Sequence, residues 1–235
     1  MARRPRNYLP GYTYHIVQRG VNKMATFFEP GDYYYYLRQL QRFADYYHLS
    51  IHAFCLMSNH THLLVTPSET NSISMTMQVV GSTYAQFINK KYKRTGSLWE
   101  GRHKPSLIDT EQYLLACYRY VEMNPVKAGI VQHPGQYQWS SYLNNALGRT
   151  GMVKPHQIYT QLGSTNKKRR SSYTAFLNIA VNSDEEDKIE KAISAGTPLA
   201  GKRYITMLEE RHGIQIALRK RGRAKPSNDR NFTER

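Results

Sequence analysis

Apolar positions in the first 150 residues follow two spacings, one typical of strands and one typical of helices. Short runs rich in apolar and β-branched residues predict strands at 13–18, 50–57, 60–66 and 104–108. Apolar residues three and four positions apart predict helices at 31–48 and 72–93. A third helix of about fourteen residues is expected between Asp109, an N-cap residue, and a stop at Asn124-Pro125. This order predicts an α+β fold, an antiparallel sheet with helices on one face.

The composition changes after Tyr142, and this change predicts how the chain is divided. Residues 1–143 are expected to form the domain that carries the chemistry, followed by a Gly- and Asn-rich linker at 144–154. Helical periodicity returns in 155–218, which we expect to form a small C-terminal helical domain. Residues 219–235 begin with five basic residues in seven and continue as a polar tail, a composition that predicts disorder.

The charge of the chain limits the kinds of partner it can have. Lys and Arg number 33 against 17 Asp and Glu, a net charge of +16, which favours nucleic acid or an anionic membrane surface. No apolar run approaches the roughly 20 residues of a membrane-spanning helix, and no signal peptide is evident. Cys55 and Cys117 are interpreted as reduced core residues. The expected protein is cytoplasmic, is associated with the nucleoid and acts on nucleic acid, without a membrane partner.

Two histidines stand two residues apart at the start of one predicted strand. His60 and His62 would leave the same face of the sheet, because successive side chains on a strand alternate between its faces. Both imidazoles could then reach one divalent ion. Such a pair on a strand is also compatible with simple packing, so the spacing alone does not identify a metal site.

The third predicted helix combines a core stripe with polar residues of chemical interest. Leu114, Tyr118 and Val121 recur at helical spacing and are expected to face the core. Tyr120 and Asn124 lie four residues apart and are therefore neighbours on another face. A carboxamide oxygen can join two imidazoles as a metal ligand, and a phenol beside the ion can act as a nucleophile.

These residues, in this order, resemble the single-tyrosine HUH transposases, and most closely the REP-associated tyrosine transposases and the related IS200-like proteins. The likeness extends over most of the chain. Beyond the histidine pair and the tyrosine helix, it includes the stretches 14–20, 55–60, 96–102 and 137–142. Two positions depart from the usual family pattern, Thr61 between the histidines and Ser58 in the preceding turn, and neither is a proposed ligand.

The resemblance implies a fold, a reaction and a substrate. The fold would be the ferredoxin-like or RRM-like HUH domain. His60, His62 and Asn124 would hold Mg²⁺ or Mn²⁺, and Tyr120 would attack a DNA phosphate to give a 5′-phosphotyrosine that a 3′-hydroxyl can later resolve. The expected substrate is single-stranded, hairpin-forming repeat DNA that flanks the gene of the protein itself. The protein would act as a monomer or a homodimer, as relatives of both kinds exist.

Basic residues near the predicted strands are candidate phosphate contacts. The resemblance favours this role for residues that precede the first strand, follow it, or flank the short fourth strand, namely Arg3, Arg4, Arg6, Arg19, Lys23, Arg102 and Lys104. His15, within the first strand, could face the site, but we interpret it as a sheet histidine that makes structural hydrogen bonds.

Two other functions remain compatible with the sequence. An RRM-like sheet with basic flanks could bind single-stranded DNA or RNA without cutting it, although no aromatic-rich strand of the RNP type is present. A hydrolase could use the histidine pair without a covalent intermediate. A Tyr120→Phe substitution separates this hydrolase from the transposase, because cleavage by water does not need the phenol.

Overall fold

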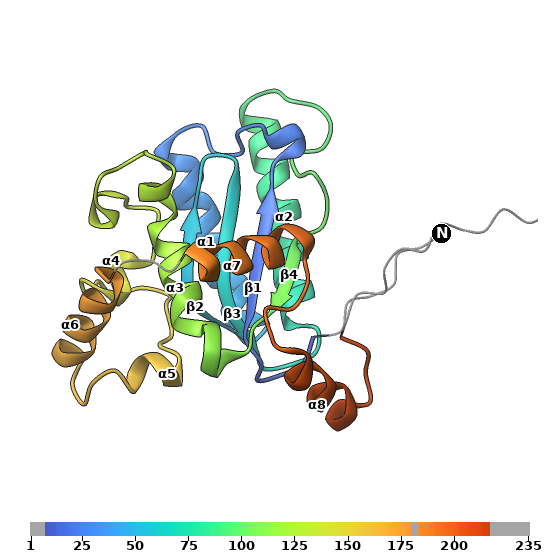
Figure 1. The fold of residues 1–235 in the computed structure, drawn as a ribbon. Helices are drawn as coiled ribbons and strands as arrows, with labels where there is room; N and C mark the ends of the chain where they lie inside the picture. Colours follow the sequence, from blue (N-terminus) through green and yellow to red (C-terminus); the bar gives the residue numbers. More distant parts are fainter. Residues whose placement is uncertain (1–7, 180–182, 217–235) are drawn as a thin grey trace, which may run out of the picture.

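A four-stranded antiparallel sheet lies at the centre of the protein (Figure 1). The structure is a computed structural model and describes residues 8–179 and 183–216. The strands stand in the order β2-β3-β1-β4. Their bounds are β1 (Tyr14–Arg19), β2 (Leu49–Leu56), β3 (His60–Pro67) and β4 (Lys104–Leu107). The predicted α+β class is therefore confirmed, and β2 and β3 pair as an antiparallel hairpin.

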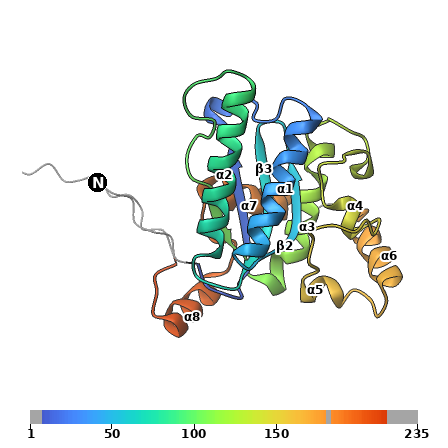
Figure 2. The same cartoon turned by 180° about the vertical axis from the view of Figure 1, so that it is seen from behind.

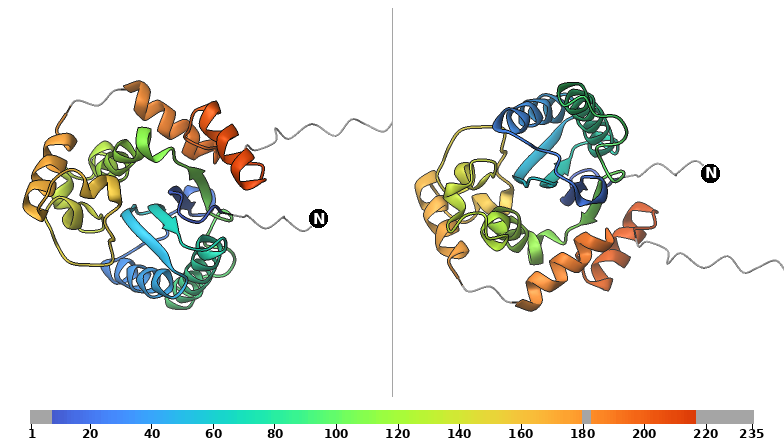
Figure 3. Two further views of the ribbon diagram at one scale, coloured as in Figure 1. Left: turned by 90° about the horizontal axis from the view of Figure 1, so that it is seen from below. Right: turned by 90° about the horizontal axis from the view of Figure 1, so that it is seen from above.

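Helices cover both faces of this sheet. The two long helices α1 (Pro30–Tyr46) and α2 (Ser72–Lys91) pack together on one face, as predicted. In addition, α3 (Thr110–Lys127) and α7 (Ser183–Ala195) lie on the opposite face. The view from behind has α1 and α2 in front of the sheet (Figure 2), and the two end-on views show helices on both sides of it (Figure 3). The reason is the composition of the strands, because apolar residues such as Leu63 and Leu64 point to opposite faces and are both buried.

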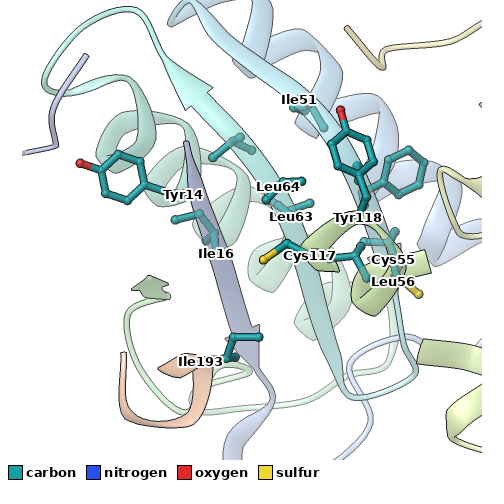
Figure 4. Close-up of a cluster of buried hydrophobic side chains, with 14 of the residues drawn as sticks. Tyr14, Ile16, Ile51, Cys55, Leu56, Leu63, Leu64, Cys117, Tyr118 and Ile193 are labelled. Carbon is teal, nitrogen blue, oxygen red and sulfur yellow. The ribbon is translucent and has the colours of Figure 1, made fainter. Parts of the chain in front are cut away.

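The core on the α3 face is built from strand residues beneath one side of that helix. Tyr118 and Cys117 of α3 lie over the sheet, close to Cys55 and Leu56 of β2 (Figure 4). Both cysteines are free and buried, as expected. The predicted assignment of Tyr118 to the core is confirmed, since its side chain is fully buried.

The helix α3 is longer than predicted. The expected stop at Asn124-Pro125 is wrong, because the helix has 18 residues and continues through Pro125 to Lys127. A proline removes one N–H and therefore one backbone hydrogen bond, but the following amides still bond normally. The N–H of Ala128 donates to the carbonyl of Asn124 at 2.9 Å, and Gly129 ends the helix in the left-handed conformation at φ 67°.

The remaining elements are short. They comprise two 3-10 turns, η1 (Val21–Lys23) and η2 (Pro134–Gln136), and the helices α4 (Tyr142–Asn145), α5 (Gln157–Thr160), α6 (Asn166–Leu177) and α8 (Lys202–His212). The C-terminal part of the chain contacts the first 143 residues directly; for example, Leu199, between α7 and α8, exchanges backbone hydrogen bonds with Leu107 and Asp109. The division into a domain, a linker at 144–154 and a second domain stays a prediction about independent folding units.

A buried carboxyl group joins α3 to two of these C-terminal helices. Glu122 accepts hydrogen bonds from Ser141 Oγ at 2.5 Å, Asn145 Nδ2 at 2.7 Å and the Tyr173 hydroxyl at 2.8 Å. Burial raises the pKa of Glu122 to about 7, although these three donors act in the opposite direction. The glutamate two residues after Tyr120 is therefore a structural residue that points away from the candidate site.

Replacing Glu122 by glutamine is expected to change how stability depends on pH. A carboxyl whose folded pKa is raised binds more protons in the folded state, so wild-type stability should fall as pH rises from the unfolded value of 4.5 through 7. Glutamine has no such titration, and the two stability curves should converge at low pH and separate by about 3 kcal/mol at pH 8. Urea unfolding of both proteins between pH 4.5 and 8 measures this difference in the free energy of unfolding. The histidines titrate in both proteins, so their contribution cancels in the difference. Parallel curves would contradict the assignment.

Candidate active site

The two histidines of β3 lie at the mouth of a cleft between the sheet, α3 and α7. His60 and His62 share one strand face, as their spacing predicted, and their ring centroids are 4.8 Å apart. His62 is only 3 % exposed, whereas His60 is partly exposed. The cleft has a volume of about 1020 Å³ and is also lined by Tyr120 and Asn124. The structure thus brings all four candidate catalytic and metal-binding residues together.

Helix α3 positions the tyrosine and the carboxamide. The Tyr120 ring stands edge-on to His62, with centroids 5.8 Å apart. Asn124 Nδ2 donates a hydrogen bond to the Tyr120 carbonyl at 2.9 Å, one helical turn back, so the amide oxygen Oδ1 remains available as an acceptor. Burial, together with the nearby carboxylates of Glu190 and Glu186, raises the pKa of Tyr120 to about 12. The phenol is therefore protonated at neutral pH.

A third histidine lies directly behind the pair. His15 of β1 is buried, and its Nε2 is 2.9 Å from Nδ1 of His62. The interpretation of His15 as a sheet histidine missed this contact. The register of β1 against β3 creates this contact. Val17 lies opposite His62 and His15 lies opposite Leu64, so His15 and His62 are diagonal neighbours on the same face. The alternation along β1 was visible in the sequence, but the pairing of β1 with β3 was not.

All three imidazoles are held in their neutral form. Burial lowers the pKa of His15 to about 3 and that of His60 to about 4, and it lowers the pKa of His62 well below its usual value. The charge of Arg19 contributes to the lowered pKa of His60, and His15 and His60 contribute to that of His62. A neutral imidazole is the form that ligates a metal ion. Protons therefore do not compete with a metal at this site near neutral pH.

The donor set fits a hard divalent cation with open coordination positions. His62 Nδ1 is occupied by His15, so Nε2 is the atom left for a metal. Within 8–179 and 183–216, no group of three or more His, Cys, Asp or Glu side chains is able to hold an ion. Two imidazoles and the oxygen of Asn124 would leave positions for water and phosphate oxygens, as Mg²⁺ or Mn²⁺ prefers.

Basic side chains line the same cleft. All four described candidates for DNA contacts are part of its wall: Arg19, Lys23, Arg102 and Lys104. Among them, Arg19 pairs with Glu100 at 2.8 Å, and Lys104 donates to the carbonyl of Ser194 at 2.9 Å. Arg3, Arg4 and Arg6 lie outside the described residues.

Lys127 is a cleft residue that the sequence analysis missed. It stands seven residues after Tyr120 and three after Asn124, so helical spacing places it on their face. Its ammonium nitrogen lies 5.5 Å from the centre of the Tyr120 ring and pairs with Glu186 at 3.3 Å. The assumed helix stop at Asn124-Pro125 concealed this signal.

Comparisons with known proteins agree with this geometry. A search of curated proteins gave no match, and no described helix is both long enough and apolar enough to cross a membrane. Among solved structures, the chain is similar to a REP-associated tyrosine transposase bound to a REP hairpin. The TM-score is 0.53 and the identity is 18 %, over 67 % of this chain and 96 % of that one. This likeness supports the fold.

The family comparison covers the candidate site itself. The model described as "Transposase IS200 like" matches residues 9–124. This span contains both histidines of β3, Tyr120 and, at its last position, Asn124. Residues 9–124 therefore have the sequence pattern of the IS200-like transposase family.

Proposed function

We propose that the protein is a metal-dependent strand transferase that nicks and rejoins single-stranded DNA through a 5′-phosphotyrosine. The match to a transposase family indicates DNA cleavage in general terms. The observation that carries the more specific proposal is the placement of the Tyr120 ring 5.8 Å from that of His62, in one cleft with His60 and Asn124. A nucleophile and a set of neutral metal ligands from two distant segments meet there.

In this reaction the Tyr120 hydroxyl oxygen attacks phosphorus, and the bond from phosphorus to the 3′-oxygen breaks. The phenol gives up its proton and the departing 3′-oxygen gains one, so the products are a phosphotyrosine ester and a 3′-hydroxyl. His60, His62 and Asn124 would hold the divalent cation, Mg²⁺ or Mn²⁺, which supplies positive charge to the non-bridging phosphate oxygens. Because the ester conserves the energy of the phosphodiester, a 3′-hydroxyl reverses the step without ATP.

The basic wall of the cleft would hold the DNA backbone. Arg19 and Lys127 are paired with Glu100 and Glu186, respectively, so phosphates must compete with these carboxylates. The proposed substrate is hairpin-forming repeat DNA flanking the gene, and the proposed setting is the nucleoid in the cytoplasm. The protein of the similar solved structure is bound to a REP hairpin, which motivates this choice of substrate.

The proposal is tested with labelled single-stranded oligonucleotides that cover both flanks of the gene. Incubation with protein and Mg²⁺ or Mn²⁺ is expected to give a metal-dependent adduct that withstands denaturing gels and disappears on proteolysis. The size of the free fragment locates the cut. Tight binding without any adduct or cleavage would instead favour the non-catalytic binding module.

His15→Ala is expected to weaken metal binding by about 10-fold or more, the usual effect of losing the partner of a ligating imidazole. A metal on Nε2 of His62 requires the tautomer with its proton on Nδ1, and Nε2 of His15, 2.9 Å away, would accept that proton in a hydrogen bond. Titration calorimetry with Mn²⁺ measures the affinity without DNA or turnover. His15→Gln, whose amide oxygen is able to accept the same hydrogen bond, should recover part of the loss. Equal affinities in all three proteins would show that His15 only packs.

A further inference from the structure

A second cavity adjoins the catalytic cleft. It has a volume of about 610 Å³ and lies between α2 and the segment 96–103 that leads into β4. Its walls include Met77, Leu98 and Trp99. Gly101 and Arg102 line both this cavity and the cleft with Tyr120, so the two spaces lie on either side of this segment.

One buried amide in this cavity has no partner. Gln18 of β1 is 6 % exposed and lines the cavity, and among the described residues its Oε1 accepts no hydrogen bond. It points to the face of β1 opposite to Arg19, which lines the catalytic cleft. A buried acceptor without a donor costs roughly 1–3 kcal/mol. A ligand with an N–H group would remove this cost.

Gly81 of α2 has no side chain and so leaves space beside Gln18. A Cβ at Gly81 would stand 3.2 Å from Gln18 Nε2 and 3.6 Å from Trp99 Nε1. Trp99 Nε1 donates to the Gly81 carbonyl at 2.9 Å and so holds the indole against the helix. The space over Gln18 therefore has an aromatic wall, a bare helix backbone and an amide at its inner end.

We propose that this cavity receives one unpaired nucleobase of the DNA strand whose phosphate lies in the catalytic cleft. The inference rests on the proposed function. A base is flat and largely apolar on its faces and carries N–H donors on its edge, which match the apolar walls and the free Gln18 oxygen. The net charge of +16 and the basic lining of the adjoining cleft favour a polyanion over other planar ligands. Arg102 would contact the backbone between base and scissile phosphate.

The test separates the contribution of bases from that of phosphates. Fluorescence anisotropy measures binding of 12-nucleotide dA, dC and dT oligomers and of an abasic 12-mer with the same backbone. Two variants of the full chain are compared with wild type. Gln18→Met removes the acceptor, and Ser82→Phe fills the cavity from an exposed position on α2. Gln86→Phe, also exposed on α2 but outside the cavity lining, is the matched control.

The expected result is a loss of at least 5-fold in affinity for one or more base-bearing oligomers in both cavity variants. Their affinity for the abasic oligomer should equal that of wild type, and Gln86→Phe should change neither. If base-bearing and abasic oligomers weaken equally, or if neither changes, the cavity is not a base site while the strand-transferase proposal stands. If wild type binds none of the oligomers, the base-site proposal fails, whereas the strand-transferase proposal is decided by adduct formation with DNA from the flanks of the gene.

Discussion

Replacing Tyr120 by phenylalanine is expected to abolish the covalent DNA adduct, with a loss of roughly 10³-fold or more, as for removal of other enzymatic nucleophiles. The ring keeps its edge-on contact with His62, 5.8 Å between centroids, so the variant should fold and bind DNA as wild type does. What it lacks is the oxygen that forms the ester bond. Denaturing gels with labelled single-stranded DNA measure both the adduct and the free fragment.

Tyr118→Phe is the matched control, because it makes the same chemical change two residues earlier on the same helix. The Tyr118 ring is fully buried in the core and contacts those of Tyr159 and Tyr173, away from the cleft lining. The Tyr118→Phe variant should therefore retain cleavage activity close to that of wild type. If metal-dependent cleavage persists in Tyr120→Phe, water is the nucleophile and the protein is a hydrolase of the kind that the sequence left open.

The parts of the site that were predictable from sequence are those set by local periodicity. The two-residue period of a strand placed His60 and His62 on one face, and the helical period placed Tyr120 beside Asn124. These patterns need no knowledge of the fold. Only the family resemblance linked the histidine pair to the tyrosine and asparagine. No local sequence pattern specifies that α3 packs on the face of β3 that carries the histidines.

The parts that were missed depend on contacts between distant segments. The bond between His15 and His62 follows from the register of β1 against β3. The carboxylates near Tyr120 come from α7, about 70 positions further along the chain, and a strongly basic chain gives no reason to expect acidic residues there. Helices on the second face were missed because an apolar strand does not reveal how many layers cover it.

The acidic residues of α7 affect the chemistry directly. Glu186 and Glu190 are both paired with Lys127 and both raise the pKa of Tyr120. DNA that enters the cleft would bring phosphates to the same lysine. The positive charge that helps Tyr120 to lose its proton must therefore come from groups nearer the phosphate, which makes the metal ligands the next residues to test.

His62→Ala is expected to remove metal-dependent cleavage, with a loss of about 100-fold or more, while DNA binding changes little. His62 is buried and fixed by His15 at 2.9 Å, so water cannot readily take the place of its nitrogen in the correct position. His60 is partly exposed, and a water molecule can replace its imidazole more easily. Raising Mn²⁺ from micromolar to millimolar concentration should therefore restore more activity to His60→Ala than to His62→Ala.

Two measurements separate a lost ligand from a damaged fold. Mn²⁺ calorimetry should show weaker binding in both alanine variants, whereas thermal unfolding without metal should change only by the cost of the small cavity. His48→Asn serves as the control, because His48 is exposed outside the cleft lining and asparagine tolerates its positive φ of 53°. If His62→Ala still cleaved DNA with an unchanged Mn²⁺ midpoint, the ion would have to bind somewhere other than β3. Tyr120 would then need another source of charge, and Lys127, whose ammonium nitrogen lies 5.5 Å from the ring centre, is a candidate in the cleft.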